Sequence, residues 1–199
     1  MNFLAHLWLA GPDEGLRLGA VAGDFVKGAL PAGLPADIAA GAALHRAIDA
    51  FAERHPAFQA SRARVSPARR RFAGVMVDLF YDHFLAAHWS DFHPDEPLPA
   101  FAQRQYRLLG HHLHRLPERA RPVVMRMGEH DWLSSYADAD TIALALDRIC
   151  GRLSRPEAFL GSGEELGARY LQFEADGVDF LHAAMAFAQR WRQTRGAPA

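Results

Sequence analysis

The stretch "FAGVMVDLFYDHFLAAHW", residues 72–89, constrains the fold more than any other part of the chain. Most of it is apolar, as expected for a helix that is buried on nearly every side. Asp78, Asp82 and His83 nevertheless stand in its middle. Burying a lone carboxylate costs several kcal/mol, because the charge loses its water. Either one side of this helix faces water, or these side chains share a partner that offsets their charge.

The composition fits one soluble globular domain. The chain has 199 residues, of which 50% are apolar, enough for a substantial core. The formal net charge of −1 gives no global signal for nucleic acid or a membrane surface. No stretch approaches the ~20 apolar residues of a membrane span, and the N-terminal apolar run lacks the basic start of a signal peptide. Cys150 is the only cysteine, so no intramolecular disulfide forms. We expect a cytoplasmic protein that binds neither nucleic acid nor membranes.

Helix signals recur along the chain, whereas sustained alternation of apolar and polar residues, the strand signal, is absent. Pro35 and Pro56 bracket one helical segment. Ser162 and Glu165 form a capping-box pattern at the start of another. We predict a single all-α domain over residues 1–199, with roughly seven or eight helices. The predicted helices cover 35–54, 67–89, 99–114, 117–129, 139–153 and 162–195, and the segment 17–30 is also helix-like.

The predicted helix 35–54 places further charged groups on an apolar face. A helix turns by about 100° per residue, so side chains four positions apart are neighbours. His45 and Asp49 are four apart and lie within the apolar stripe of this helix. In the opening stretch, Asp78 and Asp82 are likewise four apart, along the edge of an apolar stripe. Two separate helices thus carry imidazole and carboxylate groups into the predicted core.

These side chains form the donor set of a divalent metal site. Imidazole nitrogens and carboxylate oxygens, without a second cysteine, suit Mn, Fe, Zn or Mg ions. His6 and Asp24 are further candidates, because each lies in an otherwise apolar segment. Lys27 and Arg46 are placed to hold phosphate oxygens near such an ion. Each group also has a structural alternative: His6 as a core histidine, for example, or Asp49 paired with Arg46.

Four segments, "MNFLAHLWLA", "GDFVKG", "LHRAID" and "DLFYDHFLAAHW", follow one another within the first 90 residues. In this order they resemble the acyl-carrier-protein phosphodiesterase family, also called holo-ACP hydrolases, and the later "EHDWLSSY" fits that family's tryptophan- and tyrosine-containing region, here with Trp132 and Tyr136. One departure is Ala20, where asparagine is expected in many relatives. The resemblance implies a compact helical fold related to the His-Asp (HD) metal phosphohydrolases, with the order of the elements altered.

The resemblance also implies a reaction and a cofactor. A divalent metal, typically manganese with magnesium or iron as alternatives, would support removal of the 4'-phosphopantetheine arm from holo-acyl carrier protein. The products are apo-acyl carrier protein, the carrier of fatty acid biosynthesis, and free 4'-phosphopantetheine. Asp49 or His6 is the predicted proton acceptor, or the group that orients a ligand. The predicted metal ligands are Asp24, His45, Asp78, Asp82 and His83.

The basic segment "SRARVSPARRRF" is the predicted docking surface for the acidic carrier protein. Its five arginines fall within residues 62–71 with no acid between them. Arg69 and Arg70 are assigned to this contact, because opposite charge speeds the encounter of two proteins. The alternative is an ordinary solvated helix start. Two other functions stay open: an HD-like phosphohydrolase acting on a nucleotide or another small phosphoester, and a non-catalytic helical protein.

Overall fold

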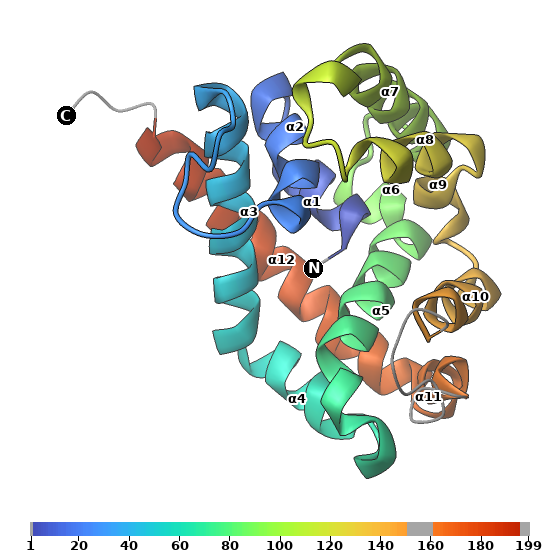
Figure 1. The fold of residues 1–199 in the computed structure, drawn as a ribbon. Coiled ribbons are helices and arrows are strands. Elements are labelled where there is room, and N and C mark those ends of the chain that lie inside the picture. Colours follow the sequence, from blue (N-terminus) through green and yellow to red (C-terminus); the bar gives the residue numbers. More distant parts are fainter. Residues whose placement is uncertain (1, 151–160, 196–199) are drawn as a thin grey trace.

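The computed structural model describes residues 2–150 and 161–195. Within these ranges every regular element is a helix, which confirms the all-α prediction (Figure 1). The elements are α1 (Phe3–Leu9), α2 (Glu14–Ala22), η1 (Gly23–Phe25), α3 (Ala36–Arg54), α4 (Pro56–Arg64), η2 (Pro67–Phe72), α5 (Ala73–Ala87), α6 (Trp89–Phe92), α7 (Leu98–His111), η3 (Leu113–Arg115), α8 (Arg121–Glu129), α9 (Trp132–Ser135), α10 (Ala139–Cys150), α11 (Ser162–Ala168) and α12 (Tyr170–Arg195), where η marks a 3₁₀-helix.

The prediction of seven or eight helices was too low, since the described residues form twelve α-helices and three 3₁₀-helices. Single-turn helices such as α6 and α9 are too short to show a hydrophobic period. The limits of α3, in contrast, are confirmed. It begins directly after Pro35, and His55 then adopts an extended conformation with ψ 131°, as a residue before proline should. Pro56 also begins α4, in whose first turn a proline is tolerated.

Several predicted helix limits are wrong. The helix-like segment 17–30 is helical only to Phe25, because α2 ends at Ala22 and the 3₁₀-helix η1 at Phe25. The helix expected from residue 67 begins only at Ala73, after the 3₁₀-helix η2. The helix expected from residue 117 begins at Arg121. The helix expected over 162–195 is divided at Arg169, whose φ of −141° is not helical.

The predicted capping box at Ser162 is also wrong. Gly161 takes the N-cap position, with a φ of +72° that favours glycine. The Glu165 carboxylate instead accepts hydrogen bonds from the backbone N–H of Ser66, at 3.2 Å, and from Arg69, at 2.9 Å. This contact joins α11 to the start of η2.

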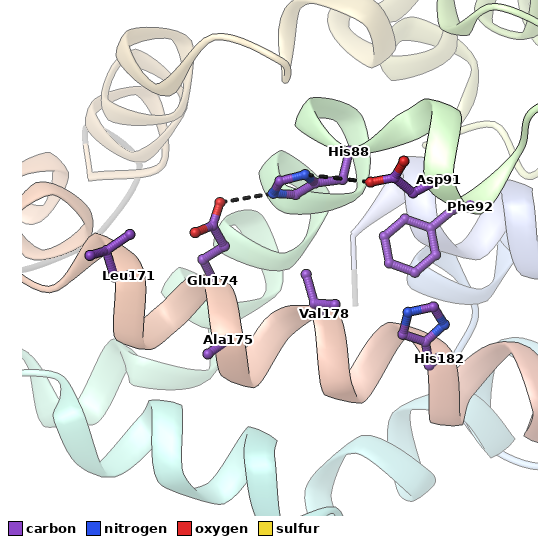
Figure 2. Close-up of a pocket in the computed structure, with 8 residues that line it drawn as sticks. All are labelled: His88, Asp91, Phe92, Leu171, Glu174, Ala175, Val178 and His182. Carbon is purple, nitrogen blue, oxygen red and sulfur yellow. Dashed lines mark hydrogen bonds and ion pairs between the residues drawn. The ribbon is translucent and has the colours of Figure 1, made fainter.

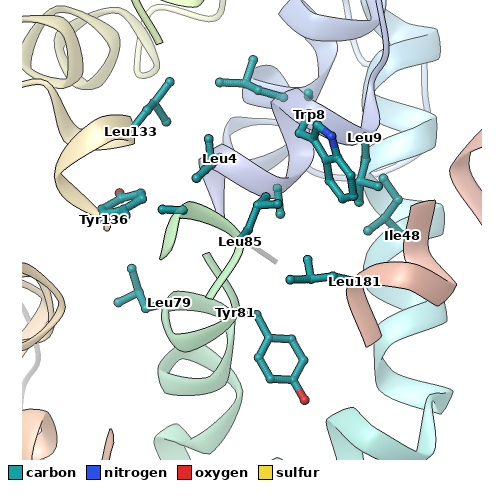
Figure 3. Close-up of a cluster of buried hydrophobic side chains, with 14 of the residues drawn as sticks. Leu4, Trp8, Leu9, Ile48, Leu79, Tyr81, Leu85, Leu133, Tyr136 and Leu181 are labelled. Carbon is teal, nitrogen blue, oxygen red and sulfur yellow. The ribbon is translucent and has the colours of Figure 1, made fainter. Parts of the chain in front are cut away.

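The core lies where α1, α3, α5 and α12 meet, and the long helix α12 crosses behind the others in Figure 1. Figure 3 shows Leu4 and Leu9 of α1, Leu85 of α5 and Leu181 of α12 around this centre. These four side chains are at most 2% exposed. Burial of such a side chain stabilises the fold by about 1.5–3 kcal/mol. Helix α1 is therefore enclosed by the fold, and any polar group it carries is enclosed too.

Helices α2 and α3 pack backbone to backbone. A Cβ atom at Gly19 would lie 2.2 Å from the carbonyl oxygen of Ile38 and 2.4 Å from the Cα of Gly41. Only glycine fits at such a crossing. The close approach brings η1, which follows α2 directly, against the middle of α3, where His45 and Asp49 lie.

Candidate metal centre

His6 of α1 meets His45 and Asp49 of α3. The Nε2 atom of His6 lies 3.2 Å from Oδ1 of Asp49, and the Nε2 atom of His45 lies 3.2 Å from Oδ2 of the same carboxylate. The two imidazole rings stack, with their centroids 3.7 Å apart. One donor atom from each residue lies within 4.8 Å of the other two, which is close enough for all three to hold one cation. We call His6, His45, Asp49 and the adjacent Asp24 the His–Asp cluster.

Asp24 joins the cluster from η1. Its Oδ1 atom is 3.4 Å from Nε2 of His45. The side chains of Asp24 and Asp49 are 44% and 42% exposed, whereas those of His6 and His45 are only 1% and 4% exposed. The cluster therefore has two buried imidazoles at its base and two carboxylates at its mouth. A small charged ligand can reach the carboxylates from solvent.

The orientation of the His45 ring is fixed by a hydrogen bond to the backbone of α2. Its Nδ1 lies 2.8 Å from the carbonyl oxygen of Ala20, so Nδ1–H donates there and Nε2 faces the carboxylates. A metal-binding histidine typically has its other ring nitrogen held in this way. Because the backbone of residue 20 makes this contact, alanine in place of the expected asparagine preserves it.

His6 is buried, but its ring nitrogens are not hydrogen-bonded as those of a typical core histidine are. Neither ring nitrogen makes a well-aligned hydrogen bond with a described residue, although both are buried. Burial, followed by the nearby charge of His45, lowers the pKa of His6 to about 4. The ring is therefore neutral near pH 7 and keeps a lone pair for a cation. A buried imidazole whose nearest polar neighbour is a carboxylate of the same cluster, without a well-aligned hydrogen bond, fits a metal site.

The pKa values of His45 and Asp49 are both shifted by contacts within the cluster. Burial alone would lower the pKa of His45, but hydrogen bonds to Asp24 and Asp49 outweigh it and raise the pKa to about 9. Burial alone would raise the pKa of Asp49, but its contacts with His45 and His6 outweigh burial and lower it. The Asp49 carboxylate is thus held ionised by positive charge, which a divalent cation supplies more fully than one proton on His45.

Asp82 lies outside the His–Asp cluster, although we predicted it as a ligand. The backbone N–H groups of Leu4 and Ala5 donate to its two carboxylate oxygens at 2.9 Å and 3.0 Å. Asp82 is fully buried, and burial raises its pKa to about 7 against the opposing effect of these two N–H groups. It caps the first turn of α1 from α5 and so fixes the helix that carries His6.

His83 and Asp78, also predicted as ligands, are likewise outside the group of three. Both nitrogens of His83 are used: they lie 2.8 Å from the carbonyl oxygen of Tyr136 and 2.8 Å from the hydroxyl of Tyr170. Burial raises the pKa of Asp78, and the charges of Asp49 and Asp24 add to the effect. The negative charges of the cluster therefore favour the protonated form of Asp78.

Of the predicted phosphate-binding residues, Lys27 lies on the loop that follows Asp24, and Arg46 lies on α3 beside this loop. Lys27 is exposed. The guanidinium of Arg46 donates to the carbonyl oxygens of Gly28, at 2.7 Å, and Val26, at 3.1 Å. Arg46 thus holds the loop that carries Lys27, and Asp49 contacts both histidines of the cluster.

The arginines of the predicted docking segment lie on α4 and η2, whereas the cluster is built from α1, η1 and α3. Arg62, Arg64 and Arg69 each form an ion pair with a carboxylate of this chain. Arg70 is exposed, and its Nε donates to the carbonyl oxygen of Val65 at 3.2 Å. Part of the positive charge of this segment is therefore already compensated within the fold.

A cleft of about 490 Å³ opens beside the His–Asp cluster. Asp24 and Phe25 of η1 line it together with Trp132 and Tyr136 around α9 and Leu144 of α10. This cleft could not be predicted from the sequence, because its walls come from several elements that no local pattern connects. The resemblance of the segment that holds Trp132 and Tyr136 was the one signal that pointed to this wall.

A second cavity of about 400 Å³ lies between α6 and α12 (Figure 2). His88 there lies 2.8 Å from a carboxylate oxygen of Glu174 and 3.9 Å from one of Asp91. This histidine is thus engaged in ion pairs, and the cavity shares no lining residue with the His–Asp cluster. Within residues 2–150 and 161–195, His6, His45 and Asp49 form the one group of three suited to a metal ion.

The fold and the cluster define an all-α protein with a half-open His–Asp site of the kind that holds a divalent cation. None of the helices in the described ranges has the length and apolar character needed to cross a membrane. The family model described as acyl carrier protein phosphodiesterase matches residues 1–184. The chain belongs to this family, as its sequence segments indicated.

Curated relatives with the same description cover nearly the whole chain. The protein from Photorhabdus laumondii is 34% identical over 175 residues, 88% of each chain. The protein from Serratia proteamaculans is 35% identical over 191 residues, 95% of this chain and 98% of the relative. Both are named acyl carrier protein phosphodiesterase. No solved structure matches the chain significantly, so the relation to the HD phosphohydrolase fold stays a prediction.

Proposed function

We propose that this protein hydrolyses the phosphodiester that joins 4'-phosphopantetheine to holo-acyl carrier protein. The observation that carries the proposal is the His–Asp cluster, which combines buried imidazoles with carboxylates open to solvent. Family membership identifies the substrate, and the cluster supplies a chemistry suited to it. Hydrolysis adds the oxygen of one water to phosphorus and breaks the bond to the serine oxygen, which takes a proton. The products are the apo-protein and 4'-phosphopantetheine.

His6, His45, Asp49 and Asp24 would hold the divalent ion, for which we propose manganese. Bound there, such an ion would act as a Lewis acid that offsets the negative charge of the phosphoryl oxygens and lowers the pKa of bound water. His6 and Asp49 are thus proposed as ligands, in place of the proton-transfer roles first assigned to them. Asp82, which fixes α1, and the carbonyl group of Ala20, which orients His45, hold the two imidazoles in position.

Lys27 and Arg46 are proposed to serve the phosphate. Lys27 lies on the exposed loop that follows Asp24, so its ammonium group can reach a phosphoryl oxygen at the mouth of the cluster. Arg46 acts through the loop, because its guanidinium is already engaged with two backbone carbonyl groups. Arg46 is therefore a positioning residue.

The test is incubation with holo-acyl carrier protein and manganese, followed by mass spectrometry of the carrier. The wild-type protein should remove the mass of the arm, and Asp24→Ala and His45→Gln should not, while both variants keep their helical circular dichroism. Asp91→Ala, an exposed carboxylate outside the cluster, is the matched control and should act like wild type. Turnover by Asp24→Ala and His45→Gln at the wild-type rate would show that the cluster is not the active site.

A further inference from the structure

The cleft of about 490 Å³ shares Asp24 with the His–Asp cluster. Its volume is within the range of about 300–1,000 Å³ that accommodates small organic ligands. Because Asp24 is 44% exposed, the cluster meets the cleft near the molecular surface. A phosphate at the cluster can therefore stay attached to a folded protein outside, while a slender group on its other side enters the cleft.

The walls of the cleft are partly apolar and partly hydrogen-bonding. Phe25 follows Asp24 directly, so an apolar wall begins next to the carboxylate. Leu144 continues the apolar surface on α10, and Ser135 and Thr141 add hydroxyl groups. The pantetheine arm has the matching composition, since a dimethyl-substituted carbon lies next to its phosphate and two amides follow between methylene groups.

We propose that this cleft binds the pantetheine arm, with the arm phosphate at the cation that Asp24 would help to hold and the carrier protein outside. This inference rests on the function proposed above and adds the site of the substrate group. It agrees with the products of the reaction, because the phosphate is released still attached to the arm. The arm and its phosphate are therefore held together, on the opposite side of the broken bond from the carrier protein. The cavity beside His88 offers no such continuity, because none of its walls belongs to the cluster.

Leu144 gives the sharpest test of the proposal. Its side chain lines the cleft and is 56% exposed, so a larger side chain there can be accommodated without disturbing the core. Leu144→Arg places a long charged group against the proposed path of the arm. Leu171→Arg is the matched control, because Leu171 is 73% exposed and lines the second cavity instead.

Two measurements separate recognition of the arm from the chemistry. The first is calorimetric binding of free 4'-phosphopantetheine, compared with inorganic phosphate and adenosine monophosphate. The second is the ratio of kcat/KM for holo-acyl carrier protein to kcat/KM for bis(4-nitrophenyl) phosphate. Leu144→Arg should weaken 4'-phosphopantetheine binding and lower the ratio, each by about tenfold or more. Leu171→Arg should leave both at the wild-type values.

The outcomes distinguish this inference from the proposed function. If wild type cleaves holo-acyl carrier protein but Leu144→Arg matches Leu171→Arg in both measurements, the arm lies elsewhere and only the inference fails. Binding of adenosine monophosphate as tight as that of 4'-phosphopantetheine would also overturn it, because the cleft would then not select the arm. If wild type does not cleave holo-acyl carrier protein, the proposed function fails and the inference fails with it.

Discussion

A methyl group added to Gly23 would collide with the imidazole ring of His45. The Cβ of an alanine at this position would lie 2.5 Å from Cγ of His45 and 2.8 Å from its Nδ1. Gly23 has ordinary helical angles, φ −53° and ψ −39°, so the backbone itself would accept alanine. The clash therefore acts on the histidine alone and removes no proposed ligand.

The size of the clash sets the expected loss. To reach an ordinary contact of 3.4 Å, the ring must move by about 0.9 Å from its position 2.5 Å from the new methyl group. Ligand distances in metal sites hold to about 0.2 Å. Such a movement also breaks the 2.8 Å contact of His45 with Ala20. We expect manganese affinity to fall by about 10–100-fold, as when an orienting partner is lost, and overpacking to reduce the free energy of unfolding by about 1–3 kcal/mol.

The assay is calorimetric titration of Gly23→Ala with manganese, together with urea unfolding and circular dichroism. Gly74→Ala is the matched control, because no atom lies within 4 Å of the added methyl group. In a helix, glycine to alanine should then stabilise the protein by about 0.5–1 kcal/mol and leave manganese affinity unchanged. Wild-type manganese affinity in a folded Gly23→Ala variant would refute the assignment of His45 as an oriented ligand.

Three further substitutions test the surroundings of the cluster. Asp82→Asn should lower the free energy of unfolding by about 1–3 kcal/mol, because an amide cannot accept both backbone N–H groups. The raised pKa of Asp82, from 3.8 to about 7, stabilises the fold at low pH, and this contribution is lost as pH rises through that range. In urea unfolding, the free energy of unfolding should therefore depend less on pH in Asp82→Asn than in wild type. An equal dependence on pH in the two proteins would contradict the effect of burial on Asp82. Arg46→Ala should speed tryptic cleavage after Lys27, because the loop loses two hydrogen bonds; an unchanged rate would show that Arg46 does not hold the loop. Arg70→Glu should lower kcat/KM for holo-acyl carrier protein more than kcat, and only at low salt, where charges steer the encounter; normal kcat/KM at low salt would place docking elsewhere.

The parts of the fold that were predicted correctly depend on local signals. Helix α3 was predicted nearly to the residue because prolines stand at both ends of a continuous hydrophobic period. The limits that failed depend on contacts between distant segments. Glu165 lies on α11 but holds the start of η2 through Ser66 and Arg69, nearly 100 positions away. A capping-box pattern gives no information about such a partner, so the sequence suggested a helix cap where the structure has a tertiary contact.

The candidate site likewise has one part that a local signal predicted and another that depends on contacts between distant segments. The pairing of His45 with Asp49 was predictable, because a separation of four residues on one helix makes them neighbours wherever the helix packs. Which other groups join them depends on how α1, η1 and α3 meet. That meeting depends on the close crossing of α2 and α3 at Gly19 and Gly41, which no hydrophobic period reveals.

The acids of the most apolar helix show why position on a helix face does not by itself identify a metal ligand. A buried carboxylate needs compensation, and a cation is one form of it. The unpaired backbone N–H groups at a helix start are another form of compensation, and the side-chain pattern does not show which carboxylate they will meet. In α5, Asp82 is compensated by the first turn of α1, and His6 lies one residue beyond Ala5, the last residue that Asp82 holds. By holding the first turn of α1, the Asp82 carboxylate fixes the helix from which the proposed ligand His6 projects. Chemical type alone therefore cannot separate a ligand from a residue that holds a ligand in position.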